Sequence, residues 1–181
     1  AEVNSSYFES SACISADGSK MFFTSESADA FHKNIGGSDI YLVEKDTTGK
    51  WSSPKNIGNV VNTEGDEMGV FLHPDGKTLF FASNGHAESF GGYDIYKTVF
   101  DKGAWTKPVN LGYPINTHKE EIFFVLSTDG QTGFYTTQRA DSRKDGDIYQ
   151  IDLKHYNVLT GETQKLGILK GPWKKKPQGN F

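Results

Sequence analysis

Three glutamates recur at one position of a pattern that repeats along this 181-residue chain. Glu9, Glu67 and Glu121 each stand eight residues before the Asp of an Asp-Gly turn. Three carboxylates gathered from successive repeats would bind a cation or an amine-bearing ligand. The structural alternative is that each carboxylate accepts hydrogen bonds from backbone amides where its repeat begins, with water between them. We favour the structural alternative.

An acidic segment from Asp141 to Asp152 resembles a calcium-binding loop in part of its spacing. Its third position is Arg143, where a cation site needs an oxygen ligand, and its last position is Asp152 rather than the longer Glu. The five histidines show no ligand spacing, and none has a partner cysteine. They are His32, His73, His86, His118 and His155. The sequence therefore predicts neither a metal site nor a cofactor.

No set of residues has the arrangement of a catalytic centre. The chain lacks a Gly-x-Ser-x-Gly nucleophile motif, and the Ser-Ala-Asp-Gly at 15–18 lacks the spacing of a sialidase Asp-box. The single cysteine, Cys13, occupies the same repeat position as the apolar Phe71 and Val125. We therefore expect Cys13 to be a buried structural thiol and the protein not to be an enzyme.

The repeat is recognised from a short phrase that the chain contains three times. Asp-Ile-Tyr begins at Asp39, Asp94 and Asp147, and the first two copies follow a Gly-Gly pair. Other landmarks recur in the same order, among them Trp51 and Trp105. The period is about 54 residues. Self-similarity at such a period is typical of repeat architectures such as propellers.

Each repeat is predicted to contain four short antiparallel strands. In the second repeat, 68–73 enters a Pro-Asp-Gly turn, the aromatic stretch 77–83 leaves it, and 93–100 follows the Gly-Gly pair. The fourth stretch, 105–112, contains Pro108, which cannot donate to a ladder and so belongs at a sheet edge. This pattern predicts an all-β fold, the β-propeller, with one four-stranded blade per repeat.

Three blades are visible, at about 8–63, 64–117 and 118–168, with the outer strand of the third expected within 156–168. Closed propellers carry about four to eight blades, so we expect these three to be part of a larger propeller. The repeated glutamates would begin the innermost strands and lie at the mouth of the central channel. Residues 169–181 are expected to be a linker or the start of a following domain.

The repeated phrase has a structural explanation. The paired glycines permit backbone angles that a Cβ would forbid. The aspartates can accept hydrogen bonds from nearby backbone amides at the start of the third strand. The tyrosines that follow two residues later can pack between neighbouring blades. These structural residues are Asp39, Asp94, Asp147, Tyr41, Tyr96 and Tyr149.

The order of these motifs resembles a known family. Glu, Asp-Gly-Lys, an aromatic strand, Gly-Gly-x-Asp-Ile-Tyr and Trp-x-x-Pro-x-Asn-Leu-Gly are similar to the WD-repeat-like, TolB-type propeller repeats of OmpA-family envelope proteins from Bacteroidota, over nearly all of 8–153. Some members belong to the type IX secretion and gliding machinery. The resemblance implies a location in the periplasm or at the outer membrane.

In that family a carboxypeptidase-regulatory-type β-sandwich and a peptidoglycan-binding OmpA-like domain commonly follow such a propeller. The segment 166–171 resembles the start of the sandwich. Peptidoglycan binding would belong to the OmpA-like domain, so it is assigned to no residue of this chain.

The connections between the second and third strands differ from repeat to repeat. They run over 25–37, 84–92 and 138–146 and vary in length, charge and aromatic content. Because strand direction alternates, they emerge on the same face as the connections 62–66 and 116–120. We call this the loop face and expect it to be the binding surface. Its candidate residues are Phe31, His32, Lys33, His86, Phe90, Arg139 and Arg143.

Charge and hydropathy narrow the range of partners. The formal net charge is −4, with 19 basic residues among 23 acidic ones, which disfavours nucleic acid, and no apolar run is long enough to span a membrane. Three hypotheses stay open: a noncatalytic interaction or scaffold module of a cell-envelope complex, a glycan-binding propeller using Phe31, Phe90 and Tyr113, and a fragment of a larger hydrolase. We expect the first, with a protein partner.

Overall fold

The computed structural model describes residues 3–26, 34–139, 146–154, 158–159 and 168–172. Within these ranges the chain forms strands and turns without a helix, in three antiparallel sheets that we call blades 1 to 3. Blade 1 contains β1 (Glu9–Ile14), β2 (Lys20–Ser25), β3 (Asp39–Glu44) and β4 (Lys55–Asn56). Blade 2 contains β5 (Glu67–Leu72), β6 (Thr78–Ser83), β7 (Asp94–Asp101), β8 (Ala104–Trp105) and β9 (Val109–Asn110). Blade 3 contains β10 (Glu121–Leu126), β11 (Thr132–Thr137), β12 (Asp147–Asp152) and β13 (Ile168–Pro172).

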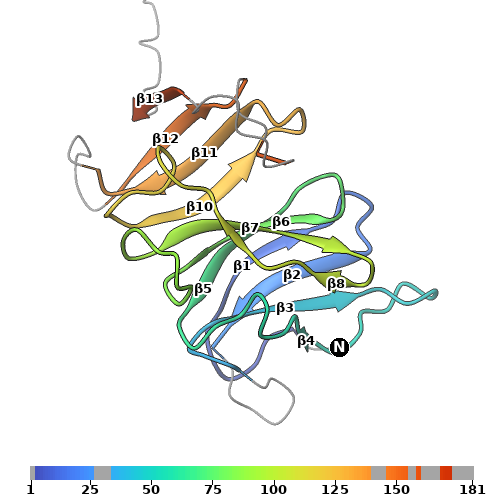
Figure 1. The fold of residues 1–181 in the computed structure, drawn as a ribbon. Coiled ribbons are helices and arrows are strands. Elements are labelled where there is room, and N and C mark those ends of the chain that lie inside the picture. The colour runs from blue at the N-terminus through green and yellow to red at the C-terminus, as the bar shows by residue number, and fades with distance from the viewer. Residues whose placement is uncertain (1–2, 27–33, 140–145, 155–157, 160–167, 173–181) are drawn as a thin grey trace, which may run out of the picture.

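The three blades lie side by side, with blade 2 in the middle (Figure 1). The innermost strand β5 contacts both β1 and β10, whereas β1 and β10 do not contact each other in the described part of the chain. The blades therefore form an open row and not a closed ring. The all-β propeller fold predicted from the sequence is confirmed.

The core fills the two junctions between blades. Strand β6 is buried on both faces, and its alternating side chains serve both neighbours. Leu79 and Phe81 belong to a cluster shared with blade 1, while Phe80 and Ala82 belong to a cluster shared with blade 3. Each fully buried aromatic side chain contributes about 1.5–3 kcal/mol through removal of its apolar surface from water. Blade packing therefore rests on the aromatic second strand that the repeat predicts.

Two of the three repeated tyrosines lie in these same interfaces, where the sequence predicts all three. Tyr96 packs in the cluster between blades 1 and 2, and Tyr149 packs in the cluster between blades 2 and 3. Tyr41 lies on the far side of blade 1 with Phe23 and Val43. All three tyrosines are at most 1% exposed, which makes them interior residues of the row.

The outermost strands begin after the prolines, and in blade 2 the single strand predicted over 105–112 is instead two short strands, β8 and β9, on either side of Pro108. Strand β4 begins after Pro54 and pairs only with β3, and β9 begins after Pro108 and pairs only with β7. The outer strand of blade 3 lies slightly later in the chain than the predicted range 156–168. It is β13, residues 168–172, which pairs with β12 and completes the sheet of this blade, so these residues do not start a separate sandwich. Residues 173–181 lie outside the described residues.

Glycine is required at the paired positions for a different reason from the predicted one. None of Gly36, Gly37, Gly91 and Gly92 has a positive φ. A Cβ on Gly36 would collide with the backbone oxygens of residues 63 and 65, and a Cβ on Gly91 would collide with those of residues 117 and 119. The glycines are therefore required because the start of the next blade passes directly against them, and not because of unusual backbone angles.

We expect Gly91→Ala to lower the free energy of unfolding by about 3 kcal/mol, because the new methyl group meets main-chain atoms that cannot rotate away. Gly49→Ala is the matched control, since nothing lies within 4 Å of its Cβ position and only its φ of +83° opposes the change. That strain costs about 1–2 kcal/mol. Urea denaturation measures both variants, and equal losses would contradict the close-approach explanation.

Candidate functional site

A network of hydrogen bonds between Asp and Asn side chains fixes the backbone beneath the loop face. In blade 2, Asn110 Nδ2 donates to Asp94 Oδ2 at 2.8 Å, and Asn110 Oδ1 accepts from Asn116 Nδ2 at 2.6 Å. Asn116 in turn brackets Ile95, accepting from its N–H and donating to its carbonyl, both at 2.8 Å. Asp94 also accepts from the Phe90 amide at 2.5 Å. The third strand, the outer strand and the loop are thus joined in one network.

Blade 1 contains the same network one repeat earlier. Asn56 Nδ2 donates to Asp39 Oδ2 at 2.7 Å, and Asn62 Nδ2 donates to Asn56 Oδ1 at 2.8 Å. Asn62 brackets Ile40 at 2.9 and 3.0 Å. Residues at equivalent positions of the two blades can therefore be compared directly.

Two of the repeated glutamates are buried and fully hydrogen-bonded. Glu67 accepts from the Thr63 amide at 2.9 Å, the Thr63 hydroxyl at 2.7 Å and the Ser83 hydroxyl at 2.6 Å. Glu121 accepts from the amide and hydroxyl of Thr117 at 2.9 and 2.7 Å and from the Thr137 hydroxyl at 2.7 Å. Hydroxyl and amide donors thus occupy both carboxylates, leaving them poorly placed to bind a cation.

Glu9 is half-buried and has fewer partners. Its carboxylate accepts from the hydroxyls of Ser5 and Ser25. Among the described residues, no three His, Cys, Asp or Glu side chains come together as a metal site would require. Likewise, no helix in the described ranges has the length and hydropathy to cross a membrane.

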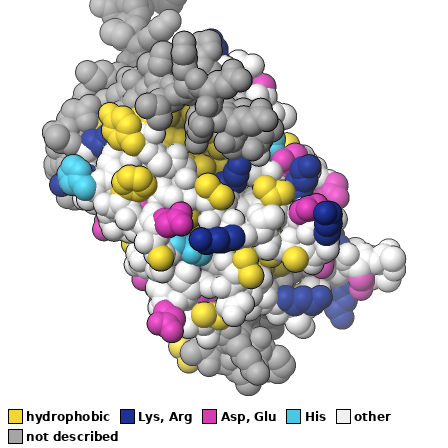
Figure 2. Space-filling view, in the orientation of Figure 1, with side chains coloured by type: hydrophobic (Ala, Val, Ile, Leu, Met, Phe, Trp, Pro, Cys, Tyr) yellow, Lys and Arg dark blue, Asp and Glu magenta, His cyan; other side chains and the backbone are white. Residues whose placement is uncertain are grey.

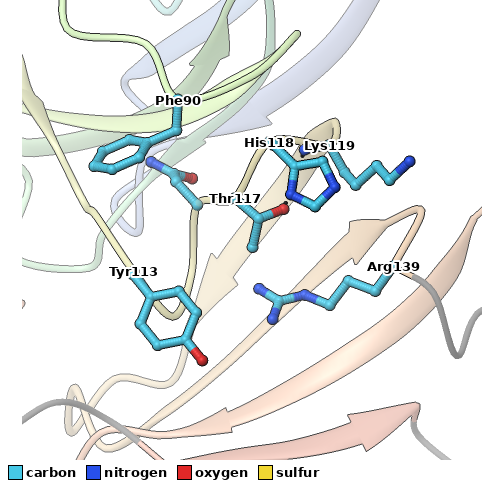
Figure 3. Close-up of a pocket in the computed structure, with 7 residues that line it drawn as sticks. Phe90, Tyr113, Thr117, His118, Lys119 and Arg139 are labelled. Atoms are coloured by element: carbon cyan, nitrogen blue, oxygen red, sulfur yellow. Dashed lines mark hydrogen bonds between the residues drawn. The ribbon is translucent and has the colours of Figure 1, made fainter.

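A pocket of about 500 Å³ opens on the loop face at the junction of blades 2 and 3. Its walls come from three connections: the β6–β7 loop, the segment between β9 and β10, and Arg139, the second residue after β11. Figure 3 shows its side chains around the opening. The lining residues are Phe90, Tyr113, Asn116, Thr117, His118, Lys119 and Arg139. Phe90 and Arg139 were predicted as binding residues, and Tyr113 as an aromatic of the glycan-binding alternative.

Arg139 is held by the blade junction. Its guanidinium donates to the carbonyls of Pro114 and Ile115, the latter at 2.9 Å, and to the Tyr135 hydroxyl at 3.0 Å. The guanidinium carbon lies 5.7 Å from the centre of the Tyr149 ring. Arg139 is thus part of the frame of the pocket, whereas the sequence alone suggested a loop residue open to solvent.

His86 plays the equivalent part at the junction of blades 1 and 2. Its Nε2 donates to the Val61 carbonyl at 3.0 Å, as Arg139 does to Ile115, and its ring lies 4.7 Å from that of Tyr96. Burial lowers the pKa of His86, although the bond to Val61 raises it. His86 therefore acts as a packing residue between blades.

The other predicted residues fall into two groups. Phe31, His32, Lys33 and Arg143 lie outside the described residues. Cys13 is half-buried, and its Sγ accepts from the Leu72 amide of the next blade at 3.3 Å. Burial raises the pKa of the Cys13 thiol, so the thiol form is favoured, although the side chain is half-buried where the sequence predicts a buried one.

The face seen in Figure 2 carries acidic and basic side chains mixed with hydrophobic ones. The pocket brings two exposed rings together. Phe90 is 58% exposed and Tyr113 is 64% exposed, and both line the same opening. Sequence reasoning did not find Lys119 or His118, although it placed the connection 116–120 on this face.

The sequence matches no protein-family model and no curated protein. Solved structures are similar in fold. TolB from Acinetobacter baumannii is 19% identical over 90% of this chain and 32% of its own, with a TM-score of 0.54. A protein described as TolB from Agrobacterium tumefaciens is 17% identical over 84% of this chain and 47% of its own, also at 0.54. A puromycin-hydrolyzing peptidase of Mycobacterium tuberculosis is 14% identical over 80% of this chain and 20% of its own, at 0.51.

These similarities show a TolB-type propeller fold. The chain spans about a third of the first TolB structure and about half of the second. Sequence identities this low carry no information on partners or activity, so function has to be argued from the site itself.

The buried Glu67 predicts a pH dependence of stability. Burial raises its pKa above the ordinary 4.5, against the lowering effect of the Ser83 and Thr63 hydrogen bonds. The folded state then binds more protons between the two pKa values, so the contribution of Glu67 to stability is present below pH 4.5 and is lost as pH rises through the folded pKa. We expect the stability of Glu67→Gln, relative to wild type, to improve as pH rises from about 4 to about 7. Urea denaturation across this range measures it; Glu64→Gln, at an exposed position, should show no such trend.

Arg139 and Lys119 both line the pocket and should differ in their effect on stability. We expect Arg139→Ala to cost about 2 kcal/mol, because the bonds to the two carbonyls and the contact with Tyr149 are lost. Lys119→Ala should stay within about 0.5 kcal/mol of wild type, because Lys119 is an exposed surface residue. Equal melting temperatures for the two variants would show that the Arg139 contacts do not hold the junction.

Proposed function

We propose that this chain is a noncatalytic interaction module that binds a protein partner through its loop face. The observation that carries the proposal is the pocket at the junction of blades 2 and 3. There two large aromatic side chains are more than half exposed on a backbone that the partly buried hydrogen bonds of Asp94, Asn110 and Asn116 hold in place. Exposed aromatic residues on a fixed frame are typical of binding surfaces.

The same contacts argue against a catalytic role. The repeated carboxylates Glu67 and Glu121 are already engaged by their own Thr and Ser neighbours. The described part of the pocket lining offers no nucleophile paired with a general base, since its hydroxyl side chains there are Tyr113 and Thr117, and Thr117 donates to Glu121. The hydrolase alternative rests on a fold likeness that covers 20% of the peptidase chain.

We further propose a location in the periplasm or at the outer membrane. Support comes from the resemblance of the repeats to those of OmpA-family envelope proteins. The residues that follow β13 would then begin the connection to a following domain, and any contact with peptidoglycan would belong to that domain. The mixed surface charge and net charge of −4 do not suit nucleic acid as a partner.

Site-specific photo-crosslinking tests the proposal. A photoreactive amino acid at exposed position 118, on the loop face, is expected to give a protein adduct in an envelope extract. One at position 77, exposed in the β5–β6 turn at the opposite end of the strands, is expected to give none. An adduct from position 77 alone would show that the wrong face was chosen. Failure of both positions would argue against a protein partner.

A further inference from the structure

The pocket has two walls of different chemistry. Phe90 and Tyr113 lie on one side of the opening, and His118, Lys119 and Arg139 lie on the other (Figure 3). Among the described residues of the lining there is no aspartate or glutamate, although the whole chain is acidic, with a net charge of −4. The pocket thus combines an apolar wall with a cationic wall on a protein of the opposite overall charge.

Two uncharged polar side chains of the lining, Asn116 and Thr117, are already used by the fold. The side-chain amide of Asn116 donates to the Ile95 carbonyl and to Asn110, and its oxygen accepts from the Ile95 amide. The Thr117 hydroxyl donates to Glu121 and accepts from the Lys119 amide. A saccharide needs several polar side chains to pair with its hydroxyls, and these two cannot supply them. The described lining is therefore better suited to a ligand with an apolar part and a carboxylate.

The equivalent junction of blades 1 and 2 provides an internal comparison. The residues that hold the backbone are the same at both junctions, as the Asp-Asn-Asn network shows. The residues at the pocket-lining positions differ between the two junctions. Asn59 stands in place of Tyr113, Glu64 in place of His118 and Gly65 in place of Lys119. The propeller frame therefore does not require the rings and cations of the second junction, and their presence needs another reason.

We propose that this pocket binds an extended acidic peptide segment of the protein partner. One aromatic or aliphatic side chain of the segment would lie between Phe90 and Tyr113, and a neighbouring carboxylate would face Lys119 and Arg139. This inference rests on the proposed function and names the chemistry of the partner. The pocket volume of about 500 Å³ lies within the range of ligand-binding pockets, about 300–1,000 Å³.

Arg139 supplies charge without moving. Its terminal nitrogen is committed to the carbonyls of Pro114 and Ile115, so the guanidinium is positioned before a ligand arrives. Its Nε is buried and has no partner among the described residues. Lys119 is exposed and is the cation most able to pair directly with a carboxylate. The cationic wall therefore has one fixed member and one adaptable member.

Peptide binding measured by fluorescence anisotropy tests the inference. The probe is a fluorescein-labelled octapeptide with one Phe flanked by Asp and Glu, and its control has Asn and Gln in their place. We expect the acidic peptide to bind at least fivefold more tightly than the neutral one at low salt, and the difference to shrink at about 0.5 M salt, where exposed charges are screened.

The variants copy residues that the fold already accepts at the first junction. Tyr113→Asn should weaken binding of the acidic peptide at least tenfold, and the double change His118→Glu with Lys119→Gly should remove the preference for the acidic peptide. The matched controls Ile14→Ala and Lys77→Glu alter exposed residues at the opposite end of the strands and should bind as wild type does. Melting temperatures check that every variant is folded.

Each contrary result has a definite meaning. Equal binding of the acidic and neutral peptides, or an unchanged affinity in both pocket variants, overturns the inference. Displacement of the probe by chito-oligosaccharide with no preference between peptides assigns the pocket to a glycan instead. If neither peptide binds while crosslinking from position 118 persists, the acidic-peptide inference fails and the proposed protein partner stands.

Discussion

The hydrogen bonds from the buried Asp94 through the half-buried Asn110 to the buried Asn116 are the interaction on which the rest of the structure depends. Strand β9 has only two residues, so it cannot hold its place in the blade by ladder bonds alone. Asn110 is the second of those two residues, and its side chain ties the strand to β7 and to the chain beyond it. Removing one member would leave buried polar partners unsatisfied, at about 1–3 kcal/mol each. The network therefore determines where the outer strand ends and where the next blade begins.

The same network connects one blade to the next. Immediately after Asn116, Thr117 binds Glu121 at the start of β10, and the Glu121 amide donates to the Tyr93 carbonyl of blade 2 at 2.7 Å. The passage is close enough that only glycine fits at Gly91. The segment that supplies His118 and Lys119 to the pocket is therefore fixed at both ends by buried contacts. Its side chains can change without disturbing the blades, which is the condition for a variable site on a constant frame.

Sequence patterns predicted the frame because the frame repeats. The turns, the aromatic second strand and the tyrosines of the Asp-Ile-Tyr phrase all have local causes that recur in each repeat and are visible there. Features set by contacts between blades were missed or misread. Each innermost strand has a bulge with a left-handed residue, at Ser11, Gly69 and Phe123. Only the middle one is glycine, so composition gave no sign of the bulge. The role of Arg139 was likewise hidden, because the carbonyls that it binds lie 24 and 25 residues earlier.

Departures from the repeat show which contacts the frame keeps when a side chain changes. In blade 1 the Tyr41 hydroxyl donates to Asn34, and Asn34 also donates to the Gly37 carbonyl. In blade 2 the equivalent residue is Ser89, whose hydroxyl donates to the Gly91 carbonyl at 3.0 Å. The shorter side chain thus keeps a bond to the paired glycines. Ser89 directly precedes Phe90, whose ring lines the pocket. The side chains of this loop therefore differ between the two blades while its contact with the glycines is kept, so the same frame can present different residues at its surface.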